Sequence, residues 1–290
     1  MNRLTFIFIW SLLLLKSQLC GQTELPIFSQ FDFEDGLGGG TLHTTLVDSA
    51  GYLWTGAYTG LQRYDGYNFY HYPVDALDDC ALHNVQVFAL AEQNSRYLWL
   101  GNAAGIYRLD RSNYCFQAFS LMGDDMEQVH YLSVYALQFA PDGKLHVGTT
   151  KGHKILDVSN SETPILQEVN QQGRMEDFTV WEGTIWAGRD NHLEQVEAGK
   201  VTASVEFPGR VRCMLPLNAD SLLVGTNTGL WWYLRGDTLP SRVFPADHEL
   251  GDVFIRALHR GPGGRIYAGT QGNGLSIFFP DGSGYQNFRA

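Results

Sequence analysis

One short pattern recurs six times along the chain, and it limits the folds that the chain can adopt. Each copy has an apolar residue, often followed by Trp, then one further residue and Gly. The copies occupy positions 53–56, 98–101, 145–148, 185–188, 222–225 and 266–269. Their glycines lie 45, 47, 40, 37 and 44 residues apart. This period is typical of one four-stranded blade of a β-propeller and is too long for one leucine-rich repeat.

A second position in each repeat supports an antiparallel hairpin. Eleven residues before five of the six glycines, a short alternating apolar stretch ends at Thr45, Leu90, Leu137, Met214 and Leu258. The fourth repeat is out of step by about one residue, with Phe178 ten residues before its glycine. Turn-forming Gly, Pro and Asp residues separate the two stretches, as in Pro-Asp-Gly at 141–143. Two strand-like segments joined by such residues indicate a hairpin.

The residues after each glycine supply two more strands. In the first repeat, positions 59–66 end in an Asp-Gly turn, and 67–72 alternate aromatic with other residues. We therefore predict an all-β protein: a β-propeller of about six four-stranded blades packed radially, which leaves few open strand edges. The expected blades are roughly 41–72, 84–120, 132–169, 174–207, 209–245 and 252–289.

Positions 27–33 look like a spare outer strand before the first repeat, although the last repeat already has its own outer strand at 285–288. Two interpretations remain open. The spare strand pairs with the final blade as a clasp, or the chain forms an incomplete seven-bladed propeller.

The first 21 residues resemble an export signal. Arg3 precedes an apolar run over 4–15, and Cys20, Gly21 and Gln22 follow. A run of about 12 apolar residues is too short to cross a membrane, which takes about 20. We expect cleavage near Gly21, so that residues 22–290 form the propeller domain. The protein would be periplasmic or secreted, with no membrane span after cleavage. An uncleaved anchor and a lipid on Cys20 are the alternatives.

The net charge of −11 excludes one class of partner and otherwise fits a soluble protein. Nucleic-acid binding rests on Lys and Arg that neutralise phosphates, so no nucleic-acid partner is expected. Three cysteines follow the signal: Cys80, Cys115 and Cys213. Cys80 and Cys115 are the only tempting disulfide pair, but we place their loops on opposite faces of a blade, which argues against a bond. Cys115 and Cys213 are expected to be small buried side chains.

The innermost strands carry a candidate binding ring. Thirteen residues before the repeat glycines, or twelve in the fourth repeat, lie His43, Phe88, Tyr135, Glu176, Arg212 and Arg256. In one interpretation the aromatic rings stack on a sugar while the charged groups bind its hydroxyl or acidic groups. In the other, these residues only pack and form ion pairs between blades.

Three further residues are weaker binding candidates. Tyr58 and Arg189 lie on loops that follow the repeat glycines, where binding and ordinary solvation are both plausible. Trp231 and Trp232 are adjacent and must point to opposite faces of their strand, so Trp232 is either exposed for stacking or buried between blades.

No pattern predicts catalytic residues, a cofactor or a metal. His146 and His153 do not have metal-ligand spacing, and the acidic residues Asp75, Asp78 and Asp79 lack that of a calcium loop. An enzyme on the same scaffold, such as a lyase using a His and an acid near the channel, remains an alternative, as does a protein-interaction platform.

Three segments carry a family resemblance. Positions 33–37 (FEDGL), 48–56 (DSAGYLWTG) and 60–66 (GLQRYDG) resemble the two-component regulator propeller repeat of Bacteroidetes-type hybrid histidine kinases. The resemblance implies a periplasmic sensor of an extracellular ligand, often an oligosaccharide released from a glycan. It also implies a downstream sensor-kinase segment or a second propeller as partner, and no kinase activity in this chain itself.

Overall fold

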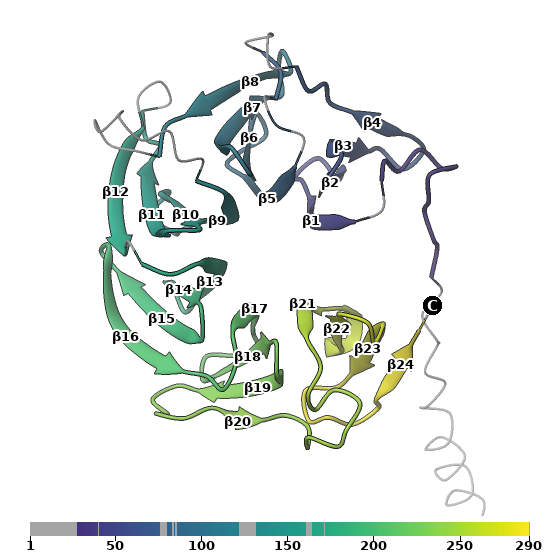
Figure 1. The fold of residues 1–290 in the computed structure, drawn as a ribbon, viewed down its shortest axis with the longest axis vertical. Helices are drawn as coiled ribbons and strands as arrows, with labels where there is room; N and C mark the ends of the chain where they lie inside the picture. Colours follow the sequence, from purple (N-terminus) through teal and green to yellow (C-terminus); the bar gives the residue numbers. More distant parts are fainter. Residues whose placement is uncertain are drawn as a thin grey trace, which may run out of the picture.

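Six four-stranded antiparallel sheets stand around a common axis, as Figure 1 shows. The computed structural model describes residues 28–39, 41–75, 80–82, 84, 86–121, 132–160, 164–170 and 172–289. Apart from the 3₁₀ turn η1 (Pro262–Gly264), the regular structure in these ranges is all strand. The predicted fold class, an all-β propeller of six four-stranded blades, is therefore confirmed.

Each blade uses four consecutive strands, from the inner strand beside the axis to the outer strand at the rim. The first three blades contain β1 (Leu42–Val47), β2 (Leu53–Ala57), β3 (Gly60–Tyr64), β4 (Phe69–His71); β5 (Val87–Glu92), β6 (Tyr97–Asn102), β7 (Gly105–Asp110), β8 (Cys115–Phe119); β9 (Val134–Phe139), β10 (Leu145–Thr149), β11 (Gly152–Asp157), β12 (Ile165–Asn170). The last three contain β13 (Met175–Trp181), β14 (Thr184–Arg189), β15 (His192–Glu197), β16 (Lys200–Glu206); β17 (Val211–Pro216), β18 (Ser221–Thr226), β19 (Gly229–Leu234), β20 (Ser241–Arg242); β21 (Ile255–Arg260), β22 (Ile266–Thr270), β23 (Leu275–Phe278), β24 (Gln286–Phe288).

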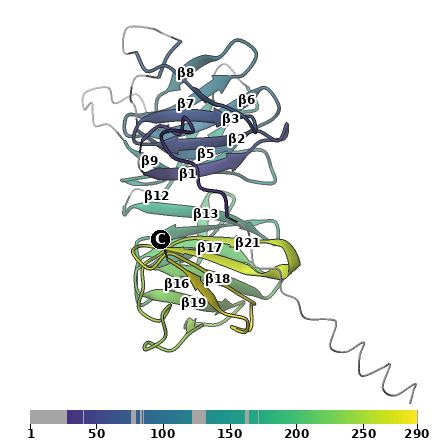
Figure 2. The same ribbon diagram turned by 90° about the vertical axis from the view of Figure 1, so that its right-hand side faces the viewer.

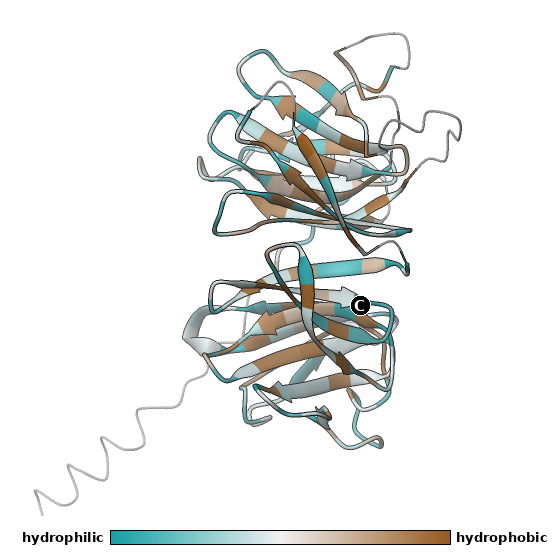
Figure 3. Ribbon diagram, turned by 90° about the vertical axis from the view of Figure 1, so that its left-hand side faces the viewer, coloured by the Kyte–Doolittle hydropathy of each residue, from teal (hydrophilic) through white to brown (hydrophobic). Residues whose placement is uncertain are grey.

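The hydrophobic core lies between blades, because each sheet is covered by its neighbours. Apolar residues concentrate in the strands, as Figure 3 shows. Five buried clusters join blades one to two, two to three, three to four, four to five and five to six. The repeat glycines allow this close approach. A Cβ added at Gly101 would lie 2.4 Å from Cγ1 of Val134, the first residue of the next inner strand.

The ring has an open side between blades six and one. The first residues of β5, β9, β13, β17 and β21 are fully buried at 0% exposure, whereas the equivalent Leu42 of β1 is 41% exposed. A Cβ at Gly269 would meet only Ala257 of its own blade, at 3.8 Å. Figure 2 faces this side, with β1 and β21 on either side of the opening. We call this place the seam.

The expected strand over residues 27–33 is absent from its described part, because Phe28–Phe33 form neither strand nor ladder. The segment instead runs from the rim of blade six to that of blade one (Figure 1). The Phe28 ring packs 5.0 Å from the Phe288 ring, and the Phe31 ring packs 5.1 Å from the Tyr64 ring. Aromatic contacts rather than strand pairing therefore fasten this segment to both ends of the ring.

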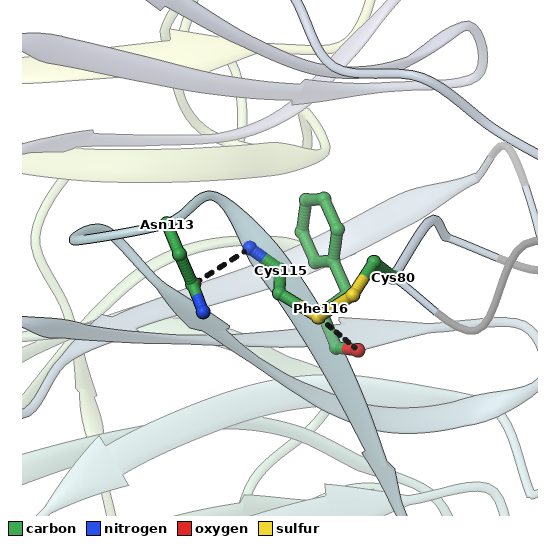
Figure 4. Close-up of a disulfide and its surroundings, with 4 residues drawn as sticks. All are labelled: Cys80, Asn113, Cys115 and Phe116. Atoms are coloured by element: carbon green, nitrogen blue, oxygen red, sulfur yellow. Dashed lines mark hydrogen bonds between the residues drawn. A yellow bond between two sulfur atoms is a disulfide. The ribbon is translucent and has the colours of Figure 1, made fainter.

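The expectation against a disulfide between Cys80 and Cys115 is wrong. The two sulfur atoms are bonded, at 2.04 Å (Figure 4). In the connection from β4 to β5, Leu82 lies in the core between blades one and two, and the Cys80 carbonyl accepts a hydrogen bond from the Phe116 backbone N–H. This contact brings Cys80 beside the start of β8, where Cys115 lies. Cys213 is free and buried, as expected.

The predicted signal segment, residues 1–21, lies outside the described residues. Within the described ranges, no helix has the length and apolar character needed to cross a membrane.

Candidate functional site

All six inner strands contain a β-bulge at the same position. In β1, Leu42 pairs with Ala57 and Thr44 with Gly56, so His43 between them has no partner in the ladder. The other five bulged residues are Phe88, Tyr135, Glu176, Arg212 and Arg256. A bulge bends its strand and redirects the side chain of the extra residue, and bulges are common beside functional sites. The six ring residues predicted from the sequence are thus the six bulged residues.

These side chains meet in one cavity of about 870 Å³ at the mouth of the central channel. The cavity is lined by all six bulged residues together with Tyr58, Arg174 and Gln271, and it reaches the seam at Leu42 and Ala257. The structure therefore brings together seven of the nine predicted site residues.

Blades one to three contribute the aromatic half of the cavity. The His43 ring packs edge-on against both Tyr58 and Phe88, with centroid distances of 4.3 and 5.0 Å. Phe88 stacks on Tyr135 at 4.9 Å with an interplanar angle of 24°. Burial, and then the positive charge of Arg256, lower the pKa of His43. Both effects favour the neutral imidazole of His43.

Blades four to six contribute the arginine half. The guanidinium of Arg174 lies 3.7 Å from the Tyr135 ring centroid, where the two halves meet. Glu176 forms ion pairs with Nε of Arg174 at 2.9 Å and with Nη1 of Arg212 at 2.7 Å. Nη1 of Arg210 lies 3.6 Å from the same carboxylate.

Arg256 completes the arginine half beside the seam. Its Nη2 donates a 2.7 Å hydrogen bond to Oε1 of Gln271, and its guanidinium lies 4.3 Å from the Phe254 ring centroid. The cavity lining thus holds three arginines and one carboxylate. A locally positive mouth in a chain of net charge −11 favours a neutral or anionic occupant.

Two predicted site residues lie elsewhere. Arg189 forms a 2.6 Å ion pair with Glu194 within blade four. Trp232 packs against the apolar cluster between blades five and six. Neither residue lines the mouth cavity.

Sequence reasoning missed Arg174 and Phe254. Both come just before an inner strand rather than within it. The offset from the repeat glycine could have found them, because they stand two residues before the bulged residues of blades four and six. The irregular spacing of the fourth repeat concealed this relation for Arg174.

Below the mouth, one carboxyl group breaks the pattern of small residues that follow the bulges. Position 177 is Asp where the other five blades have Thr44, Ala89, Ala136, Cys213 and Ala257. Burial raises the pKa of Asp177 to about 7, although the backbone N–H groups of Met214 and Phe178 donate to its carboxylate. The hydrogen bond from Met214 N–H to Oδ2 is 2.8 Å long. Asp177 therefore exchanges a proton near neutral pH.

Solved structures with the same fold include two extracellular domains from B. thetaiotaomicron, both described as parts of hybrid two-component systems. That of BT3049 matches with a TM-score of 0.74 at 16% identity, over 90% of this chain and 36% of that one. That of BT4673 matches with a TM-score of 0.70 at 18% identity, over 88% and 34%. This chain therefore spans about a third of their length.

A third structure is an enzyme, the catalytically inactive virginiamycin B lyase from Staphylococcus aureus with quinupristin. It matches with a TM-score of 0.65 at 14% identity, over 85% of this chain and 83% of that one. No family model matches the sequence, and no curated protein matches it either. In fold, the chain is a β-propeller similar to those in the extracellular domains of hybrid two-component systems.

Proposed function

We propose that this chain is an extracytoplasmic sensor propeller that binds a ligand in the mouth cavity and performs no reaction on it. The six bulges carry the proposal. The residue before each bulge is apolar in every blade, whereas the bulged residue itself is His, Phe, Tyr, Glu, Arg or Arg. Packing between blades requires an apolar residue at this position in every blade, but it does not require the bulged residues to differ from blade to blade. Such variety is typical of a recognition surface on a fixed scaffold.

The ligand class that fits best is an oligosaccharide. A cavity of about 870 Å³ lies within the usual range for small-molecule sites. Tyr58 is 49% exposed and offers apolar ring surface to the flat face of a sugar ring, and the partly buried Phe88 and Tyr135 line the same cavity. Polar groups that can bind hydroxyls come from Gln271 and the arginines. The fold shared with extracellular domains of two-component systems supports the sensor role. A downstream kinase segment or a second propeller would then receive the signal.

Binding measurements test this proposal. Calorimetric titration of residues 22–290 with oligosaccharide fractions from plant and host polysaccharides should identify a ligand with one site per chain. The variant Tyr58→Ala should weaken its binding at least tenfold, because an exposed aromatic ring of the cavity is lost. Tyr67→Ala is the matched control, since Tyr67 is 88% exposed on the turn between β3 and β4. Equal affinity of both variants would place the site elsewhere.

An enzyme is the second candidate, because virginiamycin B lyase shares the fold and the channel holds His43, Glu176 and Asp177. Glu176, however, is already paired with arginines, which suits a structural or binding role better than proton transfer. Mass spectrometry of saccharides incubated with the protein decides between the two. A product that disappears with His43→Ala would favour the enzyme.

A further inference from the structure

We propose that the ligand of the mouth cavity is an acidic saccharide, whose carboxylate or sulfate group binds the arginine half while a sugar ring stacks on the aromatic half. This inference rests on the proposed function and narrows its ligand class. It follows from how the charges are divided around the ring.

The charges lie on one side of the mouth only. His43, Phe88 and Tyr135 come from blades one to three, and Arg174, Arg212 and Arg256 from blades four to six. A neutral sugar carries hydroxyl groups on all sides, so it would be served by amides and carboxylates placed around the whole ring. A saccharide with one anionic group has a charged part and an uncharged part, which match the arginine half and the aromatic half of the cavity.

The single carboxylate of Glu176 neutralises only part of the positive charge of the arginines around it. The carboxylate is shared by Arg174 and Arg212, with Arg210 also within 3.6 Å. Arg256 forms no ion pair with a carboxylate in the part of the chain that the structure describes, and its Nη2 donates to the neutral Gln271. Arginine presents a planar set of donors that matches a carboxylate or sulfate in two-point contact.

Two buried donors in this half, Nε of Arg174 and Nε of Arg212, form no hydrogen bond among the described residues, although Nε of Arg174 is ion-paired with Glu176. A buried polar group without a partner costs free energy, so such groups normally find one. An anionic group bound in the cavity would accept from the guanidinium of Arg256, which lines it.

The experiment compares each acidic saccharide with its own neutral form. Calorimetric titrations use oligogalacturonate and its carboxyl-reduced form, and a chondroitin sulfate disaccharide with its desulfated, carboxyl-reduced form. At least one acidic probe should bind tenfold or more tightly than its neutral form. This preference should shrink when NaCl rises from 50 to 500 mM, because salt screens charge pairs.

Two arginine variants locate the preference. Arg256→Gln should reduce this preference to less than threefold, because the acidic form loses a charge pair whereas the neutral form loses at most one hydroxyl hydrogen bond. Arg265→Gln is the matched control, since it removes one positive charge from the same blade at the other end of β22 and should retain the full preference. If both variants lost the preference for the acidic form equally, the assignment would be overturned, because the preference would then depend on the overall charge of the protein and not on this site.

The remaining outcomes separate this inference from the proposed function. If the neutral forms bind as tightly as the acidic ones, the acidic class is wrong and the saccharide-binding propeller stands. If no saccharide binds at 10 mM, or if inorganic sulfate alone binds, both proposals fail.

Discussion

Two histidines form a buried pair within blade three. Nδ1 of His146 lies 2.8 Å from Nε2 of His153, and both rings are almost fully buried. The ring of His153 also packs 4.6 Å from the Phe178 ring of the next blade. Burial lowers the pKa of His146 to about 4 and holds that of His153 well below its usual value, where the neighbouring His146 adds to the effect. The pair is therefore neutral in the folded protein.

This pair predicts a loss of stability in mild acid. The unfolded histidines take up protons as the pH falls below about 6.5, whereas the folded ones do not, so the free energy of unfolding decreases between pH 6.5 and about 4. For His146 alone the loss is about 3 kcal/mol across that window. Urea unfolding at pH 7 and pH 4.5 measures it. The double variant His146→Leu/His153→Leu should lose less stability between the two pH values, and parallel losses in both proteins would refute the assignment.

Asp177 predicts the opposite pH dependence. Its carboxyl has a pKa of about 7 when folded, against 3.8 for the ordinary group, so ionisation is harder in the folded state and stability falls as the pH rises from 3.8 to 7. Asp177→Asn removes the charge and keeps an oxygen that can accept from Met214 N–H. We expect it to raise the free energy of unfolding by about 4 kcal/mol at pH 8 and to change it little at pH 4. Chemical denaturation at both pH values tests this, and a destabilised variant at pH 8 would contradict it.

At this scale the sequence located the six ring residues, because the distance from the repeat glycine fixes the position on the inner strand, but it did not predict that each of them forms a bulge. It did not predict what those residues contact. Whether Arg212 pairs with Glu176 of the neighbouring blade depends on how the two blades are rotated against each other, which the sequence does not specify. Trp232 shows the same limit, since alternation along a strand gives two faces and does not say which is covered.

The strands and their turns were predictable because both signals are local. Gly143, for example, adopts a φ of 83° in the turn between β9 and β10, and its N–H donates to the Ala140 carbonyl. The connection between His71 and Val87 has no such signal. Its path is set by Leu82, which the core between blades one and two buries completely. Packing between segments distant in sequence therefore brings Cys80 and Cys115 together, and no local pattern in the sequence indicates it.

The disulfide predicts a stability difference for blade two. Cys80 and Cys115 are 35 residues apart, and a cross-link over that distance stabilises a protein by about 3–4 kcal/mol by restricting the unfolded chain. Cys80→Ser/Cys115→Ser should lower the free energy of unfolding by that amount in urea. Dithiothreitol should lower the stability of the parent protein and have no further effect on the variant. A reductant effect of equal size on both would indicate another cause.

At the scale of the whole molecule, the seam gives different surroundings to two glycines that occupy the same position in the repeat, Gly101 and Gly269. A Cβ at Gly101 would lie 2.4 Å from Val134 and 2.8 Å from its backbone carbonyl, whereas at Gly269 the nearest atom is 3.8 Å away. Gly101→Ala should therefore destabilise the protein by about 1–3 kcal/mol through overpacking. Gly269→Ala should be neutral or stabilise by up to about 1 kcal/mol, because it restricts only the unfolded chain. Thermal unfolding of the two variants measures the difference, and equal destabilisation would show that the seam is closed in solution.

An open ring also differs mechanically from a closed hoop. In a closed ring every blade is held by neighbours on both sides, so the ring resists widening. In an open ring, small rotations at the five interfaces between blades add up at the first and last blades. His43 and Arg256 lie in those two blades and belong to the same cavity. A ligand that contacted both residues would link the first and last blades across the seam. Binding at the centre would then restrict how far the two blades can separate at the rim.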